Sequence, residues 1–227
     1  MTTPVQKWWR AVVALVAVVA GGAAIQAQQT AVFRMEFTNA QLSPSHWEIK
    51  LNPDGSGVFD AEGVGTAAGS SSGSKQIEAG AVHREIQLSP GLTEQIFATA
   101  RRRKLFAMVC DSRLKVAYQG TKRLSYSGPE GSGECEFNYS KDKDIQAIGD
   151  SLMAVETTIL FGARLEKLLV HDRLGIDREM ENLVSASKDG EALEVGTIRD
   201  TLTKIALDDQ VLERARKKAR LLLTQTN

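Results

Sequence analysis

The chain has 227 residues, of which 42% are hydrophobic and 25% charged, an ordinary balance for one globular domain or two small ones. This composition excludes a collagen-like chain, a long polar disordered chain and a multispan membrane protein. Its 28 Lys and Arg residues equal its 28 Asp and Glu residues in number, so no global field favours nucleic acid. We therefore expect no nucleic-acid partner and a function that depends on local sites.

Residues 1–27 follow the plan of a secretory signal peptide. Lys7 and Arg10 supply positive charge, Ala11–Ala20 contains only Ala, Val and Leu, and small residues precede a cleavage point after Ala27. The alternative is a retained N-terminal anchor in contact with the membrane, but an apolar run of about 15 residues is shorter than a bilayer span. The sequence predicts an exported protein, periplasmic or extracellular.

Residues 28–140 have mainly the pattern of strands, because apolar side chains recur at every second position between turn residues. This period is seen in the runs Val32–Phe37, Trp47–Leu51 and Val82–Leu88. Turn residues at 52–57 return the chain from the second run into Val58 and Phe59, which predicts a hairpin. Gly and Ser dominate 63–75, which predicts a loop.

A single helix is expected after the third of these runs. Ser89 is placed to cap it, and Pro90 suits its first turn. Its apolar residues share one face: Leu92, Ile96 and Ala100. Three more strands are predicted beyond it, at Leu114–Tyr118, Lys122–Tyr126 and Glu134–Tyr139. The pattern of residues 28–140 therefore predicts an antiparallel sheet with one helix packed across it.

The cysteine count agrees with export. Beyond the leader the chain has Cys110 and Cys135, and an even number of cysteines in an oxidising compartment favours a disulfide bond. Closing a loop of this length stabilises a fold by about 3 to 4 kcal/mol in the chain-entropy model. The alternative is a pair of buried free thiols. A redox-active pair is disfavoured because the two residues are far apart in sequence.

Residues 141–227 have the apolar period of helices and form the second part of the chain. The longest run extends from Ile145 to Arg173, and Ile198 lies in the third of the expected helices. The residues placed to end or cap these helices are Gly175, Asp177, Gly190 and Asp208. We therefore predict an α+β fold, with an N-terminal antiparallel sheet and its packed helix followed by a bundle of about four helices.

No pattern of residues predicts a catalytic, cofactor or metal site. Gly63–Ala68 matches a dinucleotide fingerprint and Gly69–Gly73 matches the Gly-x-Ser-x-Gly of hydrolases, but neither lies between a strand and a helix. The histidines lack the close spacing of a zinc site: His46, His83 and His171. Asn52, Asp54 and Asp60 suggest calcium, although a turn explains them better.

Basic residues cluster in the last expected helix: Arg214, Arg216, Lys217, Lys218 and Arg220. A second basic run, at 101–104, ends the helix of the N-terminal half. Cations near a helix C-terminus interact favourably with the helix dipole, which is a sufficient structural explanation. The functional alternative is contact with an anionic surface, such as lipid headgroups or an acidic partner.

Three stretches carry a resemblance to known proteins: Gly120–Tyr126, Cys135–Ser140 and His171–Asp177. Together they resemble an uncharacterised family of exported bacterial proteins. That resemblance covers most of the chain beyond the leader and implies no activity. The order of strands, Ser-capped helix and strands is also similar to that of emfourin-type protease-inhibitor modules.

These observations predict a non-catalytic interaction module of the cell envelope or periplasm, with a protein partner whose identity the sequence does not specify. One alternative is a secreted protease inhibitor. Another is a hydrolase whose active-site residues come together from separate loops. The sequence leaves the oligomeric state open.

Overall fold

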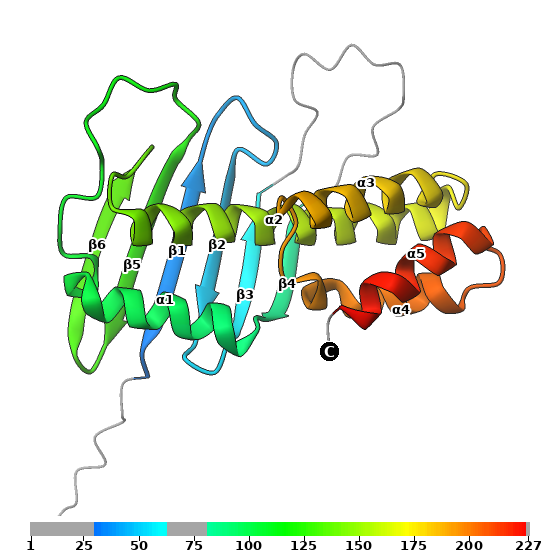
Figure 1. The fold of residues 1–227 in the computed structure, drawn as a ribbon, viewed down its shortest axis with the longest axis horizontal. Coiled ribbons are helices and arrows are strands. Elements are labelled where there is room, and N and C mark those ends of the chain that lie inside the picture. Colours follow the sequence, from blue (N-terminus) through cyan, green and yellow to red (C-terminus); the bar gives the residue numbers. More distant parts are fainter. Residues whose placement is uncertain (1–29, 63–80, 226–227) are drawn as a thin grey trace, which may run out of the picture.

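The structure is a computed structural model that describes residues 30–62 and 81–225. The signal peptide expected at 1–27 and the Gly/Ser loop expected at 63–75 lie outside the described residues. The described chain forms an antiparallel sheet followed by a set of helices (Figure 1). This arrangement confirms the predicted α+β fold class.

The sheet has six strands in the order β4-β3-β2-β1-β5-β6, and each pairs antiparallel with its neighbour. Their bounds are β1 Val32–Thr38, β2 His46–Leu51, β3 Ser56–Ala61, β4 Val82–Gln87, β5 Thr121–Gly128 and β6 Gly131–Phe137. The hairpin expected around residues 52–57 connects β2 to β3 and is confirmed. The edge strands are β4 and β6.

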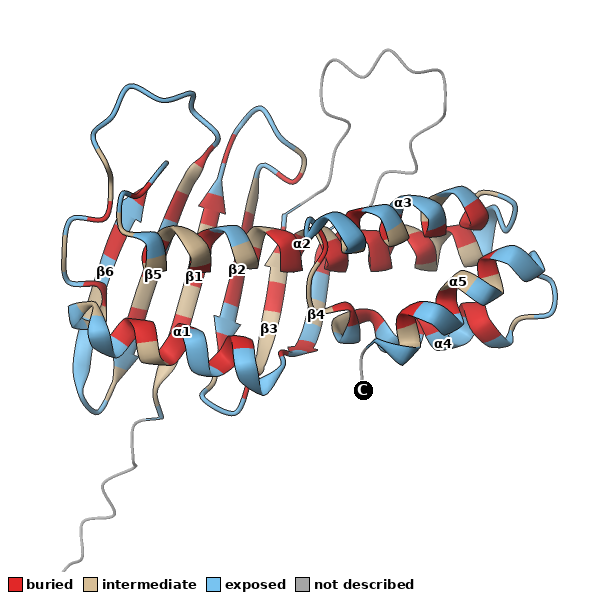
Figure 2. Cartoon of the chain, in the orientation of Figure 1, coloured by how far each residue is buried: buried red, intermediate tan, exposed pale blue. Residues whose placement is uncertain are grey.

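One face of the sheet is buried and the other is charged, because successive side chains of a strand point to opposite sides. The register sets one buried row across five strands: Phe59, Ile49, Met35, Leu124 and Cys135. Helices α1 (Pro90–Arg102) and α2 (Lys143–His171) cover this face (Figures 1 and 2). The opposite face carries a charged row: Asp60, Glu48, Glu36, Arg123 and Glu136.

Helix α1 begins and ends where the sequence predicts. The Ser89 hydroxyl accepts a hydrogen bond from the Leu92 amide, and Pro90 occupies the first turn, where a missing N–H is harmless. Leu92, Ile96 and Ala100 are buried against the sheet. Local signals are sufficient here because cap, proline and apolar face all favour the same helix.

The strand expected at Leu114–Tyr118 is wrong. The chain forms a short 3-10 turn, Lys104–Phe106, and then has no regular secondary structure until β5 begins. β5 pairs with β1 on one side and with β6 on the other, and residues 107–120 add no strand at the outer edge of β6. Arg113 adopts a left-handed φ of 55°, which interrupts an extended path.

Four α-helices make up the C-terminal part of the described chain: α2, α3 Ile176–Asp189, α4 Arg199–Leu207 and α5 Glu213–Thr224. A 3-10 turn, η2 (Val195–Ile198), leads into α4. Helix α2 is 29 residues long, and its N-cap Asp142 accepts hydrogen bonds from the amides of Asp144 and Ile145. The expected bundle of about four helices is confirmed.

Three of the expected helix boundaries are corrected by the structure. Helix α2 ends at His171, before Gly175, and it is Gly175 rather than Asp177 that occupies the N-cap of α3. Asp208 lies at the C-cap of α4, and Leu212 precedes α5. Gly190, by contrast, ends α3 as expected with a left-handed φ of 76°. Asp177 instead pairs with Arg214 and Lys218 of α5, and Asp208 pairs with Arg173 in the turn after α2.

The two halves have separate hydrophobic cores that meet along α2. Residues from Ile145 to Ala163 pack with the sheet and α1, whereas Phe161 and the last turns pack with α3, α4 and α5. The first half of α2 thus belongs to the core of the sheet, although the sequence assigns it to the helical part that begins at 141. No helix of the described ranges is long and apolar enough to cross a membrane.

Candidate functional site

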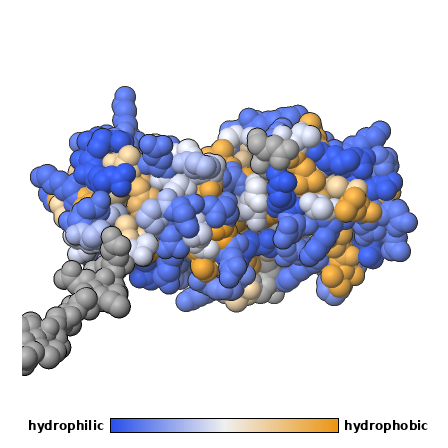
Figure 3. All heavy atoms as spheres, turned by 90° about the horizontal axis from the view of Figure 1, so that it is seen from below, coloured by the Kyte–Doolittle hydropathy of each residue, from blue (hydrophilic) through white to orange (hydrophobic). Residues whose placement is uncertain are grey.

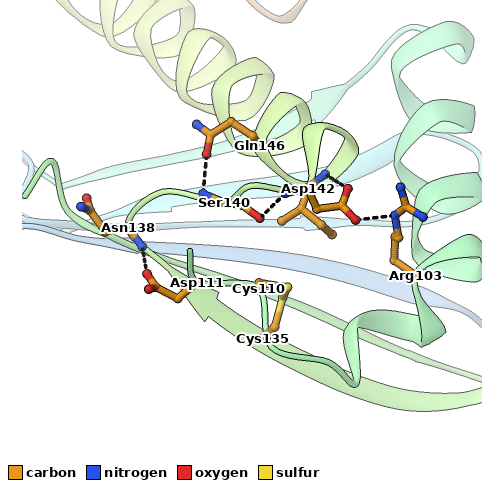
Figure 4. The surroundings of a disulfide bond; sticks show 9 residues. Arg103, Cys110, Asp111, Cys135, Asn138, Ser140, Asp142 and Gln146 are labelled. Atoms are coloured by element: carbon orange, nitrogen blue, oxygen red, sulfur yellow. Dashed lines mark hydrogen bonds and ion pairs between the residues drawn. A yellow bond between two sulfur atoms is a disulfide. The ribbon is translucent and has the colours of Figure 1, made fainter. Parts of the chain in front are cut away.

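Residues 107–120 form a surface segment, here called the anchored segment, that connects the 3-10 turn after α1 to β5. A disulfide bond joins Cys110 in this segment to Cys135 in β6, with a Cα–Cα distance of 5.7 Å (Figure 4). The predicted pairing of the cysteines is therefore confirmed. Both are buried, so the bond fixes the segment against the inner face of the edge strand.

Hydrogen bonds continue this attachment beyond the disulfide. The amide of Asn138 donates to the Asp111 carboxylate at 3.1 Å, and the amide of Ser112 donates to the Tyr139 carbonyl at 2.9 Å. The amides of Arg113 and Asn138 together lower the pKa of Asp111, because they stabilise its charged form. The first part of the anchored segment therefore runs alongside the chain that leaves β6.

The side chain of Asn138 holds the other end of the anchored segment. Its amide nitrogen donates to the Ala117 carbonyl at 3.0 Å, and its amide oxygen accepts from the Gln119 amide at 2.9 Å. Asn39 adds a hydrogen bond to the Gln119 carbonyl at 3.1 Å. Sequence reasoning missed this role. An Asn directly after a strand is the available signal, since its amide can both donate to and accept from a neighbouring backbone.

The elements beside the disulfide are also connected to one another by polar contacts. Asp142 at the start of α2 pairs with Arg103 at the end of α1 at 2.8 Å, and the Ser140 amide donates to Gln146 at 2.8 Å (Figure 4). The ends of α1, β6 and α2 therefore meet beside the disulfide. A segment attached by a disulfide bond and by hydrogen bonds to such a frame loses little conformational freedom when it binds, which favours affinity.

The anchored segment exposes apolar side chains, most of them between its attachments. We call these residues, with Tyr139 beside them, the apolar patch: Val109, Leu114, Val116, Tyr118 and Tyr139. Each is between 40% and 66% exposed. Single exposed apolar residues are ordinary, whereas a gathering on one rigid segment is typical of an interaction surface. The strand-like pattern at Leu114–Tyr118 thus marks this surface, not a strand.

We expect Asn138→Ala to loosen the anchored segment without unfolding the protein. The change removes two hydrogen bonds, each contributing about 1 kcal/mol. The Gln119 amide should then exchange with deuterium at least about tenfold faster. Asn182→Ala, an exposed residue of α3, is the control. An unchanged exchange rate for Gln119 would show that Asn138 does not hold the segment.

The basic cluster of the last helix is largely neutralised within the bundle. Arg214 pairs with Asp177 at 2.7 Å, and Lys218 pairs with Asp177 and Glu181 at 3.2 and 2.6 Å. Glu181 is the largest cause of the raised pKa of Lys218. Arg216 and Arg220 both pair with Glu213 at 2.6 Å, and Lys217 is exposed. Arg214 and Lys218 are thus balanced by acids of α3, which the linear sequence does not bring near α5, whereas Arg216 and Arg220 are balanced by an acid of α5 itself.

Apolar residues are also exposed at the far end of the helical half. They are Val170, Leu174 and Leu207, and the Arg173–Asp208 pair at 3.2 Å joins the turns that carry the last two. Figure 3 shows hydrophobic residues on this half among a mostly hydrophilic surface. No disulfide bond fastens this group, in contrast to the anchored segment.

A polar groove lies at the opposite edge of the sheet. It has a volume of about 710 Å³ and is bordered by β4, by the β2–β3 turn and by the chain that enters α4. Within residues 30–62 and 81–225, no three His, Cys, Asp or Glu side chains are close enough to hold a metal ion. Asp54 accepts from the Ser56 amide and hydroxyl, as a turn residue does.

The histidines stay apart in the fold. His83 lies 2.5 Å from Asp60 on the charged face of the sheet, His46 lies 3.8 Å from Glu62, and His171 ends α2. The serines at 69–73 fall outside the described residues. No protein-family model and no curated protein sequence matches this chain.

Proposed function

We propose that this protein is an exported interaction module that binds a partner protein through the apolar patch of the anchored segment. One observation carries the proposal: five exposed apolar residues are gathered on and beside a segment held by a disulfide bond and by both amide atoms of Asn138. Burying one such side chain against a partner contributes about 1.5 to 3 kcal/mol.

Export is supported by two independent features. The leader at 1–27 has the plan of a secretory signal, and the disulfide bond is stable in an oxidising compartment. The compartment is tested by the N-terminus of the protein recovered from cells. A chain recovered from cytosol with Met1 attached would contradict export, whereas a chain that begins near Gln28 in the periplasm or medium supports it.

The partner is expected to cross-link to the anchored segment. A photoreactive amino acid at Val116 should give a covalent adduct in exporting cells. The same group at Val170 should not, because Val170 lies at the other end of the molecule, although it is more exposed, at 71% against 44%. Mass spectrometry of the adduct identifies the partner. Equal adducts from both positions, or none from Val116, would contradict the proposal.

The affinity for that partner should depend on the apolar patch. We expect Leu114→Asp with Val116→Asp to weaken binding at least about tenfold, because a charge is then buried without a partner. The matched control is Leu174→Asp with Leu207→Asp, which places the same charges on the distal end. Isothermal titration measures both. Equal losses in the two variants would overturn the assignment of the surface.

A second candidate function, protease inhibition, is favoured by the same segment. Lys115 lies exposed between Leu114 and Val116, and the chain is fastened on both sides of them. A rigid, exposed stretch of this kind suits the cleft of an endopeptidase, where a flexible stretch is cleaved. Incubation with a panel of secreted metalloproteases and serine proteases tests it. If none is slowed, the protein is not an inhibitor of these classes.

A further inference from the structure

The groove at β4 lies at the edge of the sheet opposite the anchored segment. β4 is the outermost strand on the side of the helical half (Figure 1), and the groove separates it from the chain around η2 and the first turn of α4. The residues that line it from the helical half are Gly196, Thr197, Arg199 and Asp200. Its volume of about 710 Å³ is in the range of sites that hold peptides or small molecules.

The groove contains main-chain groups that are available for pairing. The Leu88 amide donates to the Gly55 carbonyl at 2.9 Å, and Gly57 faces Ile86 two residues further along. Hydrogen-bonded pairs alternate along an antiparallel ladder, so His83, Glu85 and Gln87 direct their N–H and C=O groups away from β3. Within the described chain, no backbone hydrogen bond from another element reaches these three residues.

The groove is lined by two acids and two cations, and no ion pair within the described residues involves its two acids. The acids are Glu85 and Asp200. The charge of Arg84 is balanced by Glu166 at 2.7 Å. Arg199, the other cation of the lining, is also not without a partner. An occupant with a basic side chain therefore complements the two free carboxylates.

Two contacts between the halves fix the walls of the groove. The Ser89 amide and hydroxyl donate to the two carboxylate oxygens of Glu194 at 2.7 and 2.6 Å. Glu166 of α2 accepts from both Arg84 and Thr201, at 2.7 and 2.6 Å. The distance between β4 and the helical wall is thus set before any ligand arrives, which lowers the entropic cost of binding.

We propose that this groove binds an extended peptide segment that adds to β4 as a further strand and places a Lys or Arg side chain near Glu85 and Asp200. Addition of a strand to a free edge supplies affinity through main-chain hydrogen bonds, and the flanking side chains supply specificity. This site is separate from the apolar patch, and its occupant is a flexible basic peptide, not a folded surface.

The test uses the full chain and a displayed library of random heptapeptides, selected on the wild-type protein against an unrelated protein. We expect enrichment of peptides with Lys or Arg. Their affinity, measured by fluorescence polarisation, should fall at least tenfold in Glu85→Pro, which removes the outward N–H at an edge position that tolerates proline. Glu85→Gln with Asp200→Asn should lower the preference for basic peptides and leave the main-chain pairing intact.

A second measurement guards against misfolding of the proline variant. N-methylation of alternate amides in a selected peptide should abolish binding to the wild-type protein in one alternation and preserve it in the other, because only one set of amides faces β4. The proposal is overturned if no peptide is enriched, if Glu85→Pro binds like the wild type, or if both methylated sets bind equally.

Discussion

Replacing Cys110 and Cys135 together by alanine is expected to lower the free energy of unfolding by about 3 to 4 kcal/mol. The disulfide closes a loop with a sequence separation of 25, and its loss returns that much conformational freedom to the unfolded chain. The effect is large because a domain of ordinary stability has only about 5 to 15 kcal/mol in total. Urea denaturation monitored by circular dichroism measures it.

The control for this experiment is the wild-type protein with a reducing agent. It should match the double alanine variant within about 1 kcal/mol, because both lack the same bond. In the variant, the amide of Ser112 should exchange faster, since its bond to the Tyr139 carbonyl depends on the anchored segment staying in place. A loss of stability below about 1 kcal/mol would show that the disulfide does little to restrict the unfolded chain.

Glu156→Gln is expected to stabilise the protein at alkaline pH and to leave it nearly unchanged in acid. Glu156 lies buried in α2, and its burial raises its pKa to about 7, while a hydrogen bond from Thr157 and the charge of Arg164 act in the opposite direction. The folded state therefore holds the proton more tightly than the unfolded state, whose carboxyl has the ordinary pKa of 4.5. The contribution of protonated Glu156 to the free energy of unfolding is therefore complete below pH 4.5 and is lost as the pH rises through about 7.

The expected gain for Glu156→Gln at pH 8 is about 3 kcal/mol, since the pKa rises from 4.5 to about 7 and each unit of pKa difference corresponds to about 1.4 kcal/mol. Urea denaturation at pH 4 and pH 8 measures it. Glu94→Gln, the same substitution at an exposed residue of α1, is the matched control. A gain for Glu156→Gln of the same size at both pH values would contradict a proton-linked cause.

The candidate site was predictable only in part. The even number of cysteines and the expected export identified the disulfide, because that inference needs composition and not contacts. The position of Asn138 directly after a strand signals a hydrogen-bonding role, but its partners Ala117 and Gln119 were not predictable, since they lie about 20 residues away in sequence. Apolar residues alternate with others along Leu114–Tyr118. This alternation is typical of a strand but also occurs on an exposed apolar surface, so the sequence could not distinguish the two.

Charge pairs between distant residues also limited what could be predicted in the helical half. Asp177 has the residue type and position of a helix cap, yet in the fold it is buried beside Arg214 and Lys218 of α5. The cations of α5 in turn have a different environment from the one that their own helix suggests. Asp177, Arg214 and Lys218 each had a sufficient local explanation, and each pairs instead with a residue of a helix more than 30 positions away. Arg216 and Arg220, by contrast, pair with Glu213 of their own helix.

The sequence by itself determined the elements whose signals are local. These include the hairpin at 52–57, the cap and first turn of α1 at Ser89 and Pro90, the long run of α2 and the left-handed end of α3 at Gly190. The tertiary structure alone decided which strands have neighbours, which carboxylates are buried or paired, and which apolar residues stay exposed. The physical reason is that turns, caps and periodicity depend on residues within about one or two turns of chain, whereas hydrogen-bond partners and desolvation depend on which elements pack together.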